Sequence, residues 1–175
     1  MNNNEPIQVG VVGLGRSGWN IHIRTFRNMT DKFRVVAVCD INEARLEEAK
    51  TSLGCKTYAR YEDFLGDQEI ELVVVATPTY LHSPYSIMAL KSRKKVVCEK
   101  PMATTTKDAD EMIRVSKETG SLLTVFQNRR YGKDHIKVKE VIASGKLGRI
   151  VQIRMTINSF GRRWDWQTLK EFGGG

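Results

Sequence analysis

Residues 7–18 run Ile7-Gln8-Val9-Gly10-Val11-Val12-Gly13-Leu14-Gly15-Arg16-Ser17-Gly18, and this stretch decides the fold. Its apolar first half predicts a buried strand, and its second half has the glycine spacing G-x-G-x-x-G. In that motif the first glycine turns the chain, the second lets backbone approach a pyrophosphate, and the third lets the next helix pack on the strand. The helix N-terminus would face the phosphates. The stretch predicts a dinucleotide site; a strand–helix turn without a ligand is the alternative.

An acidic residue follows the next apolar run, at the place where this motif needs one. Residues 35–39 predict a second strand, and Asp40 comes directly after it. A carboxylate there can accept both hydroxyls of an adenosine ribose, and its charge would repel a 2′-phosphate. We therefore expect NAD as cofactor, with NADP less likely. The alternative role for Asp40 is to cap the next helix, for which Asn42 is better placed.

The rest of the first 127 residues alternates helix and strand patterns. Helices are predicted over 42–53, 61–65, 80–91 and from Thr104 or Thr105 to 118, and a further helix is predicted beyond this range, over 134–143. Strands are predicted over 56–58, 71–76, 95–98 and 122–126, and several are apolar enough to be buried on both faces. The alternation predicts an α/β fold, a Rossmann-type doubly wound parallel sheet. Residues 1–127 would form the NAD-binding domain.

The pattern changes after residue 148. Residues 149–158 alternate apolar and polar side chains, which is typical of an antiparallel strand covered on one face. We expect residues 128–175 to contain a connecting helix and the first strand of an incomplete α+β substrate domain. One strand cannot bury its apolar face alone. Either the chain is a fragment, or a partner chain completes this edge.

Composition narrows the class of protein. The chain has 41% hydrophobic and 27% charged residues, as ordinary globular proteins do. It shows no secretory leader and no apolar run of membrane-spanning length, so we expect a cytoplasmic protein without a membrane partner. Its three cysteines lack a metal-ligand spacing and are interpreted as core residues, with no metal site. The net charge of +8 is spread over loop clusters, so no nucleic-acid partner is expected.

Three motifs in order resemble one known family. They are the glycine turn, Ala76-Thr77-Pro78-x-x-x-His82 and Glu99-Lys100-Pro101, and each follows a predicted strand. Together they resemble the glucose–fructose oxidoreductase/inositol dehydrogenase/rhizopine-catabolism (Gfo/Idh/MocA) family of nicotinamide-dependent oxidoreductases, over the whole chain. Because ligands bind at the carboxyl ends of parallel strands, we expect all these loops to meet in one crevice.

The resemblance implies an enzyme that transfers hydride between NAD and a sugar, inositol or related polyol. Lys100 is the candidate catalytic residue, because an amine with a pKa lowered by burial can take the hydroxyl proton. Side chains alternate along a strand, so Glu99 would point the other way and help to position the cofactor. A solvated strand-end lysine is the alternative for Lys100. The expected cofactor contacts are Gly13, Leu14, Gly15, Arg16, Ser17, Gly18, Asp40, Thr77, Pro78, His82, Glu99, Lys100 and Asn128.

Two of these contacts have open alternatives, and one family motif is missing. His82 can equally be structural, and Asn128 can be a solvated loop residue. Family members carry a Gly-x-His-x-x-Asp segment beyond a triple glycine, and no histidine of this chain stands in that pattern. Turnover by these 175 residues alone is therefore in doubt, and a non-catalytic NAD-binding regulatory protein is the rival function. A full-length form is expected to be a homo-oligomer built through its C-terminal sheet.

Overall fold

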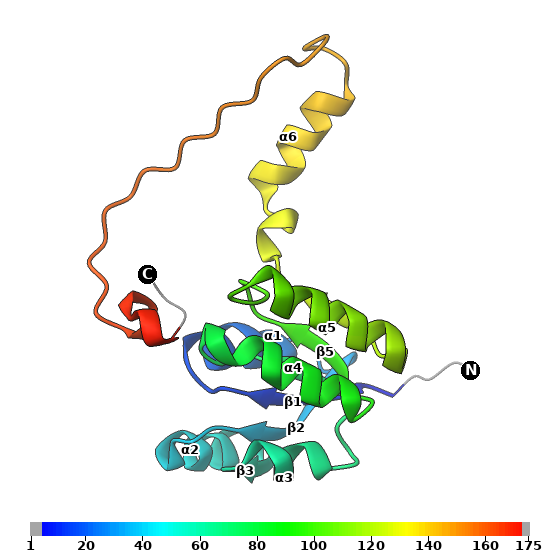
Figure 1. Cartoon of the computed structure of the whole chain (residues 1–175), viewed down its shortest axis with the longest axis vertical. Helices are drawn as coiled ribbons and strands as arrows, with labels where there is room; N and C mark the ends of the chain where they lie inside the picture. The colour runs from blue at the N-terminus through cyan, green and yellow to red at the C-terminus, as the bar shows by residue number, and fades with distance from the viewer. Residues whose placement is uncertain (1–4, 173–175) are drawn as a thin grey trace.

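The computed structural model describes residues 5–172 and contains one six-stranded parallel sheet (Figure 1). Its strands lie in the order β3-β2-β1-β4-β5-β6, which is the order of the classic dinucleotide-binding sheet. The strands are β1 (Ile7–Val12), β2 (Phe33–Cys39), β3 (Lys56–Tyr58), β4 (Leu72–Val75), β5 (Lys95–Cys98) and β6 (Leu123–Val125). The predicted fold class is confirmed, because the order reverses between β1 and β4 as a doubly wound sheet requires.

Helices connect the strands, and their ends follow local sequence signals. They are η1 (Gly18–Ile23), α1 (Arg24–Arg27), α2 (Glu43–Leu53), α3 (Tyr61–Gly66), η2 (Thr79–Leu81), α4 (His82–Lys91), α5 (Thr106–Thr119), η3 (Asn128–Tyr131), α6 (Lys133–Ala143), η4 (Trp166–Thr168) and η5 (Lys170–Phe172). Asn42 caps α2 by accepting the Arg45 N–H, and Thr105 caps α5 in the same way. Gly54 and Gly120 end these two helices in the left-handed conformation (φ +62° and +67°).

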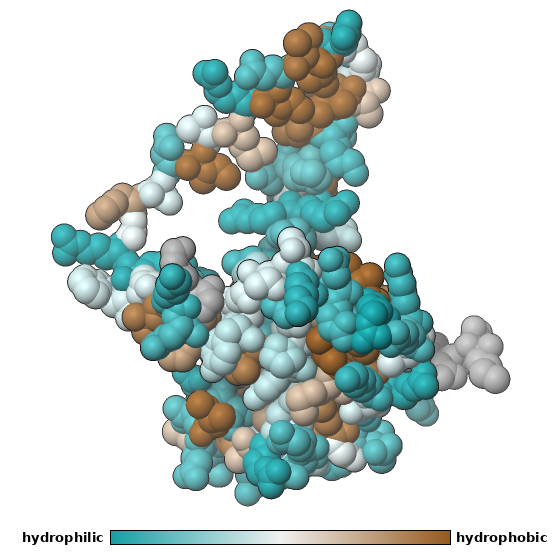
Figure 2. Space-filling view, in the orientation of Figure 1, coloured by the Kyte–Doolittle hydropathy of each residue, from teal (hydrophilic) through white to brown (hydrophobic). Residues whose placement is uncertain are grey.

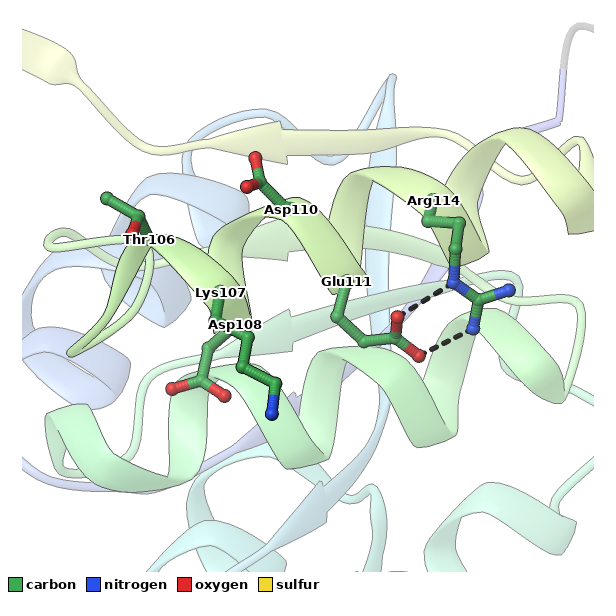
Figure 3. Close-up of a pocket in the computed structure, with 6 residues that line it drawn as sticks. All are labelled: Thr106, Lys107, Asp108, Asp110, Glu111 and Arg114. Atoms are coloured by element: carbon green, nitrogen blue, oxygen red, sulfur yellow. Dashed lines mark hydrogen bonds and ion pairs between the residues drawn. The ribbon is translucent and has the colours of Figure 1, made fainter.

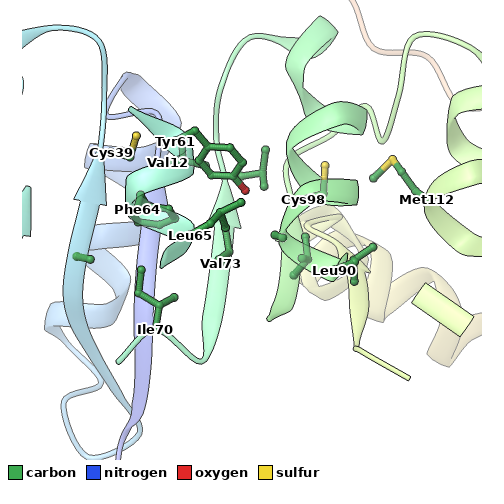
Figure 4. Packing of buried hydrophobic residues seen from close by; sticks show 14 of the residues in the cluster. Val12, Cys39, Tyr61, Phe64, Leu65, Ile70, Val73, Leu90, Cys98 and Met112 are labelled. Carbon is green, nitrogen blue, oxygen red and sulfur yellow. The ribbon is translucent and has the colours of Figure 1, made fainter. Parts of the chain in front are cut away.

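Two layers of apolar side chains hold the helices to the sheet. One layer joins strand residues such as Val73 to α3, α4 and α5, and Phe64, Ile70 and Leu90 lie close to the strands within it (Figure 4). The other layer covers the opposite set of strand side chains, including Val11 and Val74, and packs against η1, α1 and α2. The sheet is therefore rigid, and the loops at its strand ends are held in place.

Strand β6 is less buried than the sequence predicted. Residues 122–126 were predicted to form a buried strand, but β6 is the edge of the sheet and its Thr124 side chain is exposed. The prediction was wrong on this point because an apolar run does not reveal which strand has a neighbour on only one side.

After β6 the chain leaves the compact sheet. Helix α6 projects away from it, and an extended segment then returns toward η4 and η5 (Figure 1). The predicted strand over 149–158 does not form within residues 5–172, because the extended segment has no adjacent strand with which to exchange backbone hydrogen bonds. Brown apolar side chains are gathered on this projecting part (Figure 2). Val151, Ile157 and Phe160 are exposed there.

No helix among residues 5–172 has the length and apolar character that crossing a bilayer requires.

Candidate dinucleotide-binding site

The carboxyl ends of the central strands are joined into one edge by backbone hydrogen bonds. Gly13 N–H donates to Cys39 O at 2.8 Å, and Ala76 N–H donates to Val12 O at 2.9 Å. Farther along the sheet, Glu99 N–H donates to Val75 O at 2.9 Å, and Phe126 N–H donates to Cys98 O at 2.8 Å. The loops that follow these strands therefore start side by side, at the edge where such sheets bind ligands.

The glycine turn is built so that two of its glycines cannot carry a side chain. Gly13 has φ +89°, and a Cβ atom there would lie 2.6 Å from Ala76 O. A Cβ atom on Gly18 would lie 1.9 Å from Gly13 O. Gly18 was predicted to allow close packing of helix on strand, but the atom that excludes a side chain is the carbonyl of Gly13. The third glycine thus closes the turn itself.

The middle glycine faces open space. A Cβ atom on Gly15 would meet no protein atom within 4 Å. Leu14 is buried, Ser17 is half-buried, and Arg16 is exposed. This arrangement leaves room beside the Gly15 backbone, which is where a pyrophosphate approaches in this class of turn.

Asp40 is buried beside the turn and bonded to it. Its Oδ2 accepts the Leu14 N–H at 2.6 Å, and its Oδ1 accepts the Asn42 N–H at 2.9 Å. Arg45 Nη1 lies 3.5 Å from Oδ2, and the Arg45 side chain is half exposed. A carboxylate has about four acceptor positions, and the Leu14 N–H, the Asn42 N–H and the Arg45 guanidinium occupy three of them, so Oδ1 retains capacity for one hydroxyl donor. Asp40 stabilises the start of α2 through Asn42, and its own geometry still fits a ribose.

Glu99 and Lys100 follow β5 and differ in burial, because the Glu99 side chain is buried and Lys100 is exposed. The Glu99 carboxylate is buried and accepts from His22 Nε2 at 3.0 Å and from the Lys100 N–H at 3.1 Å. Burial would raise the pKa of Glu99, but the hydrogen bond and charge of His22 and the Lys100 N–H outweigh it and hold this pKa below its ordinary value. Lys100 is exposed, so the burial predicted for it is wrong in this structure.

His82 joins the loop after β4 to the loop after β5. Its Nδ1 lies 2.7 Å from Pro101 O, and its Nε2 lies 3.0 Å from Thr77 O. A neutral imidazole can donate to only one of these carbonyls, whereas a protonated ring can donate to both. Both ring nitrogens are thus occupied by backbone, so the structure gives His82 a bridging position. His82 therefore has no free ring nitrogen with which to bind a cofactor, and the structure does not support the predicted cofactor contact.

The remaining predicted contacts lie around the same edge. Thr77 and Pro78 are half-buried after β4, and the Thr77 Oγ1 atom is buried without a hydrogen-bond partner among residues 5–172. A buried hydroxyl needs a hydrogen-bond partner, which a ligand or a water molecule can provide. Asn128 is exposed in η3, and its side chain makes no hydrogen bond within the part of the chain that the structure describes.

Sequence reasoning missed His22. A histidine inside the helix after a glycine turn carries no motif that distinguishes it from a core residue. The signal that could have found it is its polar character on the buried face of that helix, where Gly18 and Ile23 are also buried.

The buried cysteines and Lys94 have structural roles. Burial raises the pKa of Cys39 to about 12 and that of Cys98 to about 11, so both remain thiols in the core. Within residues 5–172, no group of three or more His, Cys, Asp or Glu side chains could hold a metal ion. Lys94 is buried, and its ammonium group donates to Asp67 O at 2.9 Å.

A shallow pocket lies on the outer surface of α5 (Figure 3). The Arg114 guanidinium pairs there with the Glu111 carboxylate through two hydrogen bonds of 2.7 and 2.6 Å. All the lining residues that Figure 3 labels come from this one helix. The pocket is separate from the strand ends, and exposed pairs of this kind are common on helix surfaces.

Comparison with known proteins gives consistent results. The sequence profile of a family described as "Oxidoreductase family, NAD-binding Rossmann fold" matches residues 7–127. Inositol 2-dehydrogenase of Salmonella typhimurium (strain LT2) is 31% identical over 169 residues, which make up 95% of this chain and 48% of that protein. The chain therefore spans about half the length of the curated relatives that it matches.

Solved structures resemble the chain over a similar share of their length. The crystal structure of an NAD-binding protein from Listeria innocua is 34% identical with a TM-score of 0.87, covering 97% of this chain and 50% of that one. The WlbA dehydrogenase from Chromobacterium violaceum, crystallised with NADH and UDP-GlcNAcA, is 28% identical with a TM-score of 0.80. That match covers 84% of this chain and 42% of WlbA.

Proposed function

We propose that this chain, which belongs to the Gfo/Idh/MocA oxidoreductase family with an NAD-binding Rossmann fold, is the cofactor-binding part of an NAD-dependent dehydrogenase. Its substrate would be a sugar, inositol or related polyol, with hydride transferred between the nicotinamide and a CH–OH group. The chain covers about half of its curated relatives, so the substrate and the complete activity belong to the proposal.

The observation that carries the proposal is the joint geometry of the glycine turn and Asp40. The open side of Gly15 provides space for a pyrophosphate, and helical backbone begins at Arg16, within the turn, and continues into η1. Asp40 is bonded to the same turn through Leu14, and its Oδ1 atom retains acceptor capacity for a ribose hydroxyl. The buried negative charge disfavours a 2′-phosphate, which supports NAD over NADP.

Lys100 would serve as the proton-transfer residue. Bound NAD supplies the hydride acceptor. The Lys100 amine would take the proton from the substrate hydroxyl and, once charged, stabilise the oxygen of the forming carbonyl. The exposed position of Lys100 directly after β5 supports this role, because its amine is accessible to a substrate at this edge of the sheet.

Residues 128–175 would begin a substrate domain. Their apolar side chains on α6 and the extended segment are exposed here, including Val141, Val151 and Phe160. An apolar surface of this kind needs a covering layer. We assign that role to the remainder of a full-length protein, whose sheet would also form the contact between copies of a homo-oligomer.

The proposal is tested with the full reading frame of the source gene. The purified product is incubated with NAD and a panel of inositols, sugars and sugar acids, and NADH formation is followed by its fluorescence. We expect NADH with at least one polyol and a loss of that signal in Lys100→Met. NADH formation by Lys100→Met at the wild-type rate would contradict the role of Lys100. Absence of any turnover together with absence of NAD binding would contradict the proposed function.

A further inference from the structure

A buried hydrogen bond joins the helix after the glycine turn to the loop after β5. His22 belongs to η1 and Glu99 follows β5, and the two side chains are 4% and 8% exposed. The Nε2 and Oε1 atoms are 3.0 Å apart. An ionised carboxylate only accepts hydrogen bonds, so His22 Nε2 carries the proton and donates. Buried residues of these types require such a partner.

The same carboxylate is bonded to the backbone of Lys100. Glu99 Oε2 accepts the Lys100 N–H at 3.1 Å, while Oε1 holds His22. The His22 ring also packs against Phe126 at the end of β6, with ring centroids 4.5 Å apart. His22 is thereby fixed between the ends of β5 and β6, and it fixes in turn the orientation of the Glu99–Lys100 peptide.

The helix that carries His22 is unusual. Residues Gly18–Ile23 form a π-helix, which starts at the third glycine of the turn. Such helices are rare, occur mostly as single turns, and are frequent at functional sites. One short element therefore closes the phosphate turn at its first residue and reaches Glu99 at its fifth.

We propose that His22 is a positioning residue that sets the Glu99–Lys100 turn against the nicotinamide half of the dinucleotide. This inference rests on the proposed function. In a doubly wound sheet, the two mononucleotide halves lie on opposite sides of the point where strand order reverses. Asp40 follows β2 on one side, and Glu99 and Lys100 follow β5 on the other. The His22–Glu99 contact consequently supports one half of the ligand and leaves the other half to Asp40.

The test compares two ligands that differ only on the nicotinamide side. NAD and ADP-ribose share the adenosine and the pyrophosphate, and both are titrated calorimetrically into the 175-residue chain. His22→Phe removes a hydrogen bond to a charged group, so we expect it to weaken the binding of NAD by about tenfold. The binding of ADP-ribose should weaken by less than about twofold. His22→Gln should bind NAD within about twofold of the wild type, because its amide can still donate to Glu99. His135→Phe, at an exposed position on α6, is the matched control and should change neither affinity.

Two results for the variants would overturn the inference. Equal weakening of NAD and ADP-ribose in His22→Phe would mean that His22 only supports the helix. Unchanged NAD affinity would mean that the contact has no role in binding. If the wild-type chain binds neither ligand, the proposed function fails and the inference fails with it.

If His22→Phe does not fold, an NMR measurement on the wild-type chain tests whether His22 supports the nicotinamide half of the site. The chain has three histidines, so its imidazole NMR signals are few, and the His22 signal is identified by its loss in His22→Gln. We expect that signal to shift on addition of NAD and to stay in place with ADP-ribose. An equal response to both ligands, or no response to NAD, would overturn the inference.

Discussion

Replacement of Asp40 by asparagine tests the geometry of the cofactor site most sharply. The carboxylate accepts the Leu14 N–H and the Asn42 N–H with different oxygens. The asparagine side chain has one oxygen, so one of these N–H groups would face an amide NH₂ group instead. Leaving a buried donor unsatisfied costs about 1–3 kcal/mol. We therefore expect Asp40→Asn to lower the free energy of unfolding by that amount in urea titrations.

The same substitution should change cofactor selectivity. A 2′-phosphate about 5 Å from a unit charge interacts with it by about 3 kcal/mol per unit of phosphate charge, at an effective dielectric constant of about 20. That energy corresponds to about a hundredfold in affinity. Asp40→Asn should therefore reduce the preference for NAD over NADP by about a hundredfold, because the repulsion is lost while the half-exposed Arg45 remains.

Calorimetric titration of both nucleotides into both proteins measures this ratio. Asp110→Asn removes a charge from the exposed surface of α5 and is the matched control, with both selectivity and stability expected to stay as in the wild type. A wild-type NAD to NADP ratio that persists in Asp40→Asn would remove Asp40 from the ribose site.

Three further predictions concern the same edge of the sheet. Gly18→Ala places a Cβ atom 1.9 Å from Gly13 O, so it should lower the free energy of unfolding by about 1–3 kcal/mol and abolish NAD binding. The added Cβ atom of Gly15→Ala meets no protein atom, so this variant should lose NAD binding while its stability stays unchanged. Equal stability of the two variants in urea titrations would contradict this geometry. Lys100→Met should leave stability and NAD affinity nearly unchanged, because the Lys100 side chain is exposed; a large loss of either would contradict its placement. The lowered pKa of Glu99 means that its contribution to stability is complete above its ordinary value of 4.5 and is lost as the pH falls through its folded value. Unfolding measured between about pH 5 and pH 2 should show this loss, and the slope should be smaller in His22→Phe.

Local patterns were sufficient for the sheet and for the ends of most helices. The apolar run before the glycine turn and the cap at Asn42 depend only on residues near them in sequence, so both could be predicted. The glycine spacing also indicated where backbone would approach a phosphate, and the space beside Gly15 agrees with that prediction.

Contacts between distant segments were not accessible from sequence patterns. His22 and Glu99 are 77 residues apart, and no local signal links them. The sequence left open whether Lys100 is buried or solvated, since burial depends on which loops cover the end of a strand. The predicted strand over 149–158 had the right alternation but lacks an adjacent strand in the described part of the chain.

The central claim is that the glycine turn and Asp40 together form an NAD site. Calorimetric titration of the 175-residue chain, first with NAD and then with NADP, tests it directly. The account predicts saturable binding of NAD with a dissociation constant in the micromolar range, about 8 kcal/mol of binding free energy, and much weaker binding of NADP. Absence of NAD binding by the folded chain, or equal affinity for the two nucleotides, would contradict it.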